Sequence, residues 1–114
     1  MQKINPHIPN PVKRAVRKLG QDIRDARLRR RIPTKVLAER ASISRMTLYN
    51  VENGDPNVSF GTYATILFAL GMIERVNDLA DVSQDSLGRQ LDEERLPKRI
   101  RLRKAKSQDE AGGS

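Results

Sequence analysis

Residues 34–53 read Thr-Lys-Val-Leu-Ala-Glu-Arg-Ala-Ser-Ile-Ser-Arg-Met-Thr-Leu-Tyr-Asn-Val-Glu-Asn, and no other stretch constrains the architecture of this chain as strongly. The apolar spacing predicts two short helices, the first capped by Thr34 and the second, over 45–53, capped by Ser44. Two such helices can cross steeply only if their contact is small and their apolar residues meet at the elbow between them. The residues expected at this elbow are Leu37, Ala41, Ile43, Leu48 and Val51.

This pattern is typical of a helix-turn-helix arrangement, in which the second helix enters the major groove of DNA. The turn of that motif usually contains a glycine, because one residue adopts a left-handed backbone conformation there. In this chain the position is occupied by Ser42, which costs about 1 kcal/mol relative to glycine.

Apolar spacing also predicts the helices around the motif. Apolar residues at alternating steps of four and three indicate a helix from residue 12 to about 31. Pro33 stops this helix, because the residue before a proline is disfavoured in helical conformation. Gly20 lies inside it and costs about 1 kcal/mol of helix stability relative to alanine. The apolar residues are Val12, Val16, Leu19, Ile23 and Ala26. Further helices are expected from Ser59 or Phe60 to Gly71, around 74–80, and around 85–95 before Pro97.

Because no alternating strand pattern occurs, the predicted fold is all-α: a compact five-helix domain with an additional C-terminal helix and a basic tail. The expected organisation is a flexible, proline-rich leader over 1–11, a DNA-binding domain over 12–82, an appended helix over 83–96 and a flexible tail over 97–114.

Composition excludes several classes of function. The chain of 114 residues has no cysteine and one histidine, His7, so disulfides, cysteine-based metal sites and thiol- or histidine-dependent catalysis are excluded. We therefore expect neither an enzyme nor a bound cofactor or metal. No apolar run approaches the ~18 residues of a membrane span, which predicts a soluble, cytoplasmic protein without membrane contact.

The net charge of +8 is divided unevenly along the chain: +10 over residues 1–45, −7 over 46–94 and +7 over 95–106. A basic front favours a polyanion as its partner, whereas the acidic middle is better suited to a second subunit or a protein partner. The basic tail leaves four possibilities open, since it could extend a dimer, bind the DNA backbone, dock on a partner or stay disordered.

Three stretches resemble the Cro/phage-repressor (XRE-type) family of DNA-binding domains over roughly residues 15–80. They are Leu-Gly-Gln-Asp-Ile-Arg-Asp-Ala-Arg at 19–27, the motif at 34–53, and Glu-Asn-Gly-Asp-Pro-Asn-Val-Ser-Phe-Gly-Thr-Tyr at 52–63. Within that family, Ser-Phe-Gly-Thr-Tyr-Ala-Thr-Ile-Leu-Phe-Ala-Leu-Gly at 59–71 and Leu-Pro-Lys-Arg-Ile-Arg at 96–101 are similar to antitoxins of the HipB type.

The resemblance implies a lambda-repressor-like fold and a homodimeric transcriptional repressor on a palindromic operator. It further implies the antitoxin of a HipBA-like type II toxin-antitoxin pair, which represses its own operon and binds a HipA-like serine/threonine kinase toxin. The alternative is a stand-alone XRE-family regulator without a toxin partner.

The resemblance assigns DNA base contacts to Ser44, Arg45, Met46 and Asn50. Their chemistry agrees, because arginine can bond guanine O6 and N7, and asparagine can bond adenine N6 and N7, through two parallel hydrogen bonds. Met46 offers only an apolar contact. Tyr49 could touch the sugar-phosphate backbone or pack locally.

Phosphate contacts are expected at helix N-termini, where free N–H groups point at anions. The residues expected there are Thr34, Lys35, Thr47, Asn57, Ser59 and Phe60. The cluster Arg29–Arg31 could meet the DNA backbone or be a solvated charge run. The resemblance also implies a structural ion pair between Arg27 and Glu52, which would fix the angle of the second helix of the motif.

Overall fold

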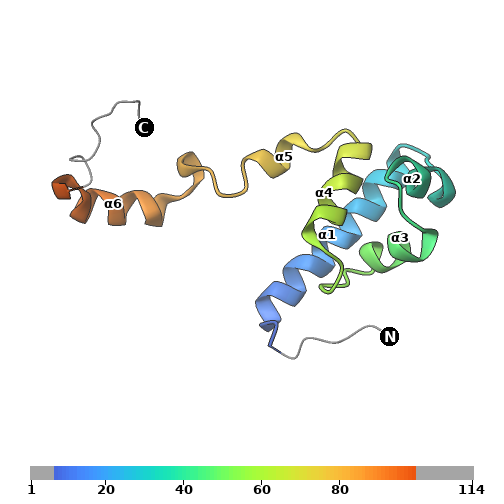
Figure 1. Ribbon diagram of the computed structural model, residues 1–114, viewed down its shortest axis with the longest axis horizontal. Coiled ribbons are helices and arrows are strands. Elements are labelled where there is room, and N and C mark those ends of the chain that lie inside the picture. Colours follow the sequence, from blue (N-terminus) through green and yellow to red (C-terminus); the bar gives the residue numbers. More distant parts are fainter. Residues whose placement is uncertain (1–6, 100–114) are drawn as a thin grey trace. The chain divides into compact units, whose positions relative to one another are not determined.

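The computed structural model describes residues 7–99, and every regular element in this range is a helix (Figure 1). The helices are α1 (Asn10–Arg29), α2 (Thr34–Arg40), α3 (Arg45–Glu52), α4 (Phe60–Ala69), α5 (Glu74–Asn77), the 3₁₀ helix η1 (Val82–Gln84) and α6 (Ser86–Arg99). The all-α class is therefore confirmed. Residues 1–6 of the leader and 100–114 of the basic tail lie outside the described range.

The chain divides after Val76 into two compact units, six residues before the boundary expected at residue 82. The first unit contains α1 to α4 and most of α5, and the second contains η1 and α6. Every member of the hydrophobic core belongs to the first unit.

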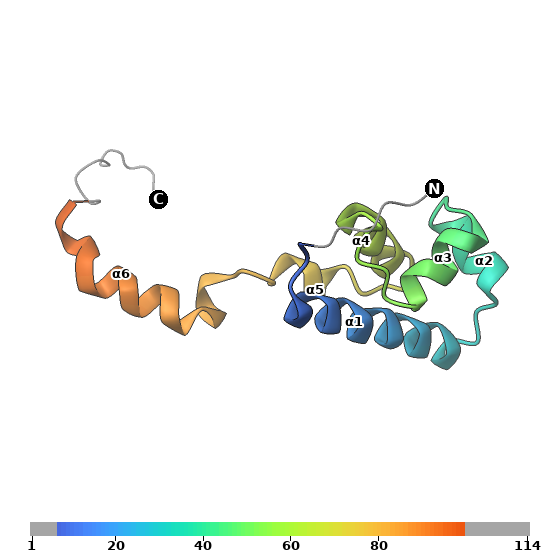
Figure 2. The ribbon, with the colours of Figure 1, turned by 90° about the horizontal axis from the view of Figure 1, so that it is seen from below.

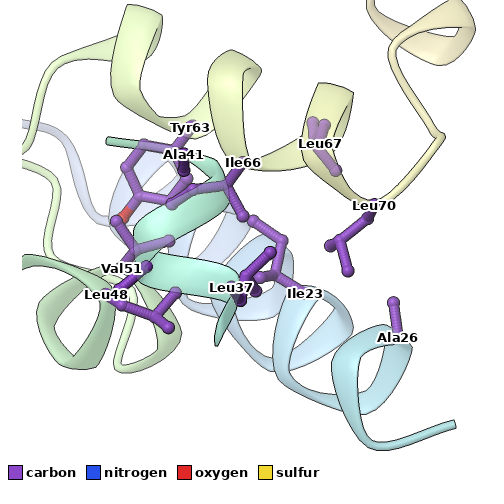
Figure 3. Packing of buried hydrophobic residues seen from close by; sticks show 11 residues of the cluster. Ile23, Ala26, Leu37, Ala41, Leu48, Val51, Tyr63, Ile66, Leu67 and Leu70 are labelled. Carbon is purple, nitrogen blue, oxygen red and sulfur yellow. The ribbon is translucent and has the colours of Figure 1, made fainter. Parts of the chain in front are cut away.

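The core of the first unit forms where α2, α3 and α4 pack on one side of α1 (Figure 2). The fully buried side chains at its centre come from all four helices (Figure 3): Ile23, Leu37, Leu48, Val51 and Ile66. The elbow predicted between α2 and α3 is confirmed, because four of its five residues are buried and Ile43 packs against them from the turn.

Helices α1 to α4 all end in the same way. In each, one residue past the C-cap has a positive φ, and the next N–H donates to a carbonyl five residues back. The left-handed residues are Arg31 (φ 53°), Ser42 (φ 57°), Gly54 (φ 73°) and Gly71 (φ 81°). The left-handed conformation predicted for Ser42 is thus confirmed. Arg31 was not predicted, because Pro33 alone was expected to stop α1.

Two glycines let α1 approach the end of α3 at backbone distance. A Cβ atom on Gly20 would lie 2.7 Å from the backbone nitrogen of Gly54 and closer still to the carbonyl oxygen of Val51. A Cβ on Gly54 would in turn collide with the backbone of Arg17. Gly20 is therefore a contact point between two helices, whereas the sequence suggested only an interruption of α1.

Some predicted boundaries and faces are wrong. Helix α1 begins two residues earlier than expected, and Val12 is 46% exposed because the core starts only further along α1. Helix α5 is a single turn rather than a helix to residue 80. Helix α6 continues through Pro97 to Arg99, at the cost of the hydrogen bond for which proline has no N–H.

Candidate nucleic-acid interface

Ser44 fixes the start of α3. Its backbone is extended (φ −76°, ψ 160°), and its Oγ accepts a hydrogen bond from the Thr47 N–H at 3.0 Å. The hydroxyl proton of Ser44 is donated to Thr47 Oγ1 at 2.9 Å. The predicted cap is confirmed. The N–H groups of Arg45 and Met46 belong to the first turn, where no carbonyl of the helix can accept from them, and they remain available.

The face of α3 that points away from the core carries the residues predicted to contact bases. Leu48 and Val51 anchor the opposite face in the core. Arg45 is exposed and makes no ion pair or side-chain hydrogen bond with the described residues, Met46 is 65% exposed, and Asn50 is half-buried. At 100° per residue these three side chains share one arc of the helix, together with Tyr49, which is 64% exposed.

The start of α4 repeats the arrangement at α3. Ser59 Oγ accepts a hydrogen bond from the Thr62 N–H at 3.1 Å, and Phe60 is the first helical residue. The amides of Phe60 and Gly61 therefore point out of the helix end. Asn57 differs from the prediction, because its N–H already donates to Asp55 Oδ1 at 2.8 Å and is not free for phosphate.

The start of α2 lacks a side-chain cap. Pro33 stands at the N-cap position with extended backbone (φ −65°, ψ 152°), so the prediction that Thr34 caps this helix is wrong. The first hydrogen bonds of the helix run from Val36 and Leu37 to the Pro33 carbonyl. The N–H groups of the exposed residues Thr34 and Lys35 consequently remain available, as a phosphate contact would require.

An ion pair joins α1 to the last residue of α3. Arg27 Nε donates to Glu52 Oε2 at 2.7 Å, and Arg27 Nη2 donates to Glu52 Oε1 at 3.0 Å. Both side chains are less than a tenth exposed, and the hydrogen bond to Glu52 raises the pKa of Arg27 against the opposing effect of burial. Arg27 Nη1 also donates to the Ile32 carbonyl at 3.2 Å. The ion pair implied by the resemblance is confirmed.

Tyr63 holds the loop between α3 and α4 in place. The ring is buried in the core, and the hydroxyl donates to the Asp55 carbonyl at 2.8 Å. Burial, followed by the charge of Asp55, raises the pKa of Tyr63 to about 12. The hydroxyl therefore stays protonated and keeps donating to the loop that leads to Ser59.

A hollow beside the exposed arc of α3 was not predicted. Its volume is about 340 Å³, and it is lined by Gln21, Arg24, Tyr49, Glu52 and Asn53. A periodic signal was present in the sequence, because Arg17, Gly20, Arg24 and Arg27 follow one another at steps of three and four along one face of α1. The contact of Gly20 with α3 and the Arg27–Glu52 ion pair place this basic face beside Tyr49 and Asn53.

Within residues 7–99, no helix is both long enough and apolar enough to cross a membrane. Comparisons of the chain with models of protein families, with curated proteins and with solved structures give no match.

Proposed function

We propose that the protein is a sequence-specific DNA-binding transcriptional repressor, in which α2, the turn and α3 act as the helix-turn-helix of a lambda-repressor-like domain. The observation that carries this proposal is the exposed arc of α3. It presents Arg45, Met46 and Asn50 from a helix that Leu48 and Val51 anchor in the core. An arginine and an asparagine on one exposed arc suit the edges of guanine and adenine in a major groove.

The helix starts support the same function. Available N–H groups at the N-termini of α2, α3 and α4 suit phosphates on either side of a bound α3. The basic front of the chain adds a favourable, sequence-independent attraction to DNA.

A homodimer belongs to the proposal, because a single helix as short as α3 contacts too few base pairs to discriminate among sequences. Two copies on half-sites about 34 Å apart, one turn of DNA, bring specific affinity into the usual range. The proposed operator is therefore palindromic, and the proposed site of action is the cytoplasm.

The second unit supports an antitoxin role for the same protein. Its side chains include Leu79, Val82 and Leu87, all more than half exposed, among the acidic residues of the stretch 74–94. An acidic surface with exposed apolar side chains repels a polyanion and suits a protein partner. Together with the resemblance to HipB-type antitoxins, this favours a HipA-like kinase as that partner over a stand-alone regulator.

In vitro selection from a random duplex library tests the DNA-binding role, since a repressor of this kind should enrich a palindrome. On the enriched sequence, Arg45→Ala should weaken binding by about 1–3 kcal/mol, with the loss confined to one G·C pair per half-site. Arg75→Ala, which removes an exposed charge from the acidic middle of the chain, is the matched control and should leave the affinity unchanged. An equal loss on all sequences would contradict the assignment of Arg45 to base contact.

Co-purification from the native host tests the antitoxin role. The tagged protein should retain a serine/threonine kinase, identified by mass, that is encoded beside its own gene. Arg45→Ala should leave that complex intact, because the substitution lies outside the second unit. Recovery of the protein without such a kinase, together with a selected palindrome, would favour the stand-alone regulator.

A further inference from the structure

The hollow between α1 and α3 has the donors expected of an anion site. Arg24 projects from α1, is exposed, and forms no ion pair or side-chain hydrogen bond with the side chains that the structure describes, those of residues 7–94. An arginine in this state has five N–H donors to offer, in a planar fork that matches a phosphate. Gln21, Tyr49 and Asn53 line the same space, and the side-chain amides of Gln21 and Asn53 each donate one proton within the helices, which leaves each a second proton to donate.

The acidic groups nearby do not cancel this charge. Glu52 lines the hollow, but both of its oxygens already accept from Arg27. Asp22 is neutralised by its ion pair with Lys18 at 2.7 Å, and Asp25, which keeps its charge while accepting a hydrogen bond from Gln21 Nε2 at 3.1 Å, does not line the hollow. Among the residues that line the hollow, Arg24 therefore carries the one charge without a partner, and it makes the hollow electrostatically positive.

The position of the hollow relative to the arc of α3 indicates which anion it meets. An α-helix with its side chains is ~10–12 Å wide and fills a major groove that is ~12 Å wide, so an element packed beside such a helix lies against the sugar-phosphate backbone. Tyr49 and Asn53 follow Arg45 by one and two turns, and Gln21 and Arg24 of α1 stand beside them, so the hollow lies where α1 flanks the C-terminal half of α3.

From this geometry we infer that the hollow is a phosphate clamp: Arg24, with Tyr49 and Asn53, binds a phosphodiester of the DNA backbone where one strand passes α1. The inference rests on the proposed DNA-binding function and deepens it, because it gives α1 a direct role at the DNA in addition to its role in holding α3. The shared chemistry is that of a phosphate group, whether it belongs to DNA or is free in solution.

Two charge-removing variants of the full chain test the clamp. Arg24→Gln removes the proposed contact, and Lys18→Gln removes an exposed charge about 120° away around the same helix. Anisotropy of a labelled duplex of random sequence, about two turns long, measures affinity against salt concentration. Arg24→Gln should weaken binding about fivefold to tenfold and lower the slope of log K against log[salt] by ~0.9 per subunit. Lys18→Gln should change neither beyond about twofold.

Inorganic phosphate, titrated into labelled protein and followed by NMR, separates the two sources of the anion. Phosphate should shift the side-chain N–H signals of Arg24 and Asn53, and Arg24→Gln should abolish the shift at Asn53. If those shifts occur while Arg24→Gln binds DNA as the wild type does, the hollow is a site for free phosphate and the clamp is refuted.

The remaining outcomes distinguish the clamp from the proposed function. Equal losses in Arg24→Gln and Lys18→Gln would mean that net charge, rather than a contact in the hollow, accounts for the effect. Wild-type binding that does not depend on Arg24 overturns the clamp alone. A wild type that binds neither random nor selected duplex overturns the proposed function and the clamp with it.

Discussion

Substituting alanine for Gly20 opposes two contributions to the stability of the first unit. In the interior of a helix, alanine is favoured over glycine by about 1 kcal/mol, since it loses less backbone entropy on folding. Sequence alone therefore predicts that Gly20→Ala stabilises the protein. The structure predicts instead that Gly20→Ala destabilises the protein.

The added Cβ would lie 2.7 Å from the Gly54 nitrogen and still closer to the Val51 carbonyl oxygen. Both atoms are backbone, and Gly54 is itself held against α1 at Arg17, so no flexible side chain can yield. Overpacking a well-packed site costs about 1–3 kcal/mol, and a backbone neighbour places Gly20 at the upper end of that range. After the gain in helix propensity, we expect a net loss of about 2 kcal/mol.

Urea denaturation followed by far-ultraviolet circular dichroism measures this difference. Gly61→Ala is the matched control, because Gly61 is exposed in α4 and its Cβ would find only Ser59 Oγ, at 3.9 Å. That variant should be as stable as the wild type or gain up to about 1 kcal/mol. A Gly20→Ala protein that gains stability as Gly61→Ala does would refute the proposed close approach of α1 and α3.

Three further perturbations have defined outcomes. Glu52→Leu leaves the buried Arg27 guanidinium unpaired and should cost about 3–5 kcal/mol in denaturation, most of which the double variant Arg27→Met/Glu52→Leu should recover. Ser42→Gly should stabilise the protein by about 1 kcal/mol, because glycine adopts φ 57° without strain; a loss would show that the Ser42 side chain has a contact of its own. The raised pKa of Tyr63 favours the protonated side chain in the folded state, so its contribution to stability should be complete below pH 10 and decline up to about pH 12. Tyr63→Phe should remove that decline relative to the wild type, and a denaturation series at alkaline pH compares the two.

The parts of the fold that depend on local rules could be predicted from the sequence. The period of the apolar residues located α1 to α4, and Ser44 marked the start of α3 because a serine before an apolar run satisfies a free N–H. The predicted turn conformation of Ser42 was also correct. Each of these features is determined by residues within four or five positions of one another.

The resemblance correctly implied one contact between distant residues, the Arg27–Glu52 ion pair, but other features that depend on how segments pack or turn were missed. The sequence showed Gly20 only as a poor helix former, because nothing local indicates that Val51 and Gly54 lie against it. Asn57 was expected to offer a free N–H, but the Asp55 carboxylate two residues earlier takes it by folding back in a turn. The hollow at Arg24 was missed although the ion pair implied between Arg27 and Glu52 already indicated which face of α1 meets α3, because the side chains around an open space cannot be located from one contact.

Helix α1 helps to fix the direction of α3 in addition to the turn of the motif and the packing of α2. It holds the end of α3 at two points seven residues apart, the close contact of Gly20 with Val51 and Gly54, and the ion pair of Arg27 with Glu52. Two points separated by two helical turns, about 10 Å, fix a rotation as well as a distance. The turn at Ser42 and the buried elbow hold the other end of α3. If the proposed function holds, substitutions at Gly20 and Arg27 should therefore impair sequence recognition, although both residues lie away from the exposed arc of α3.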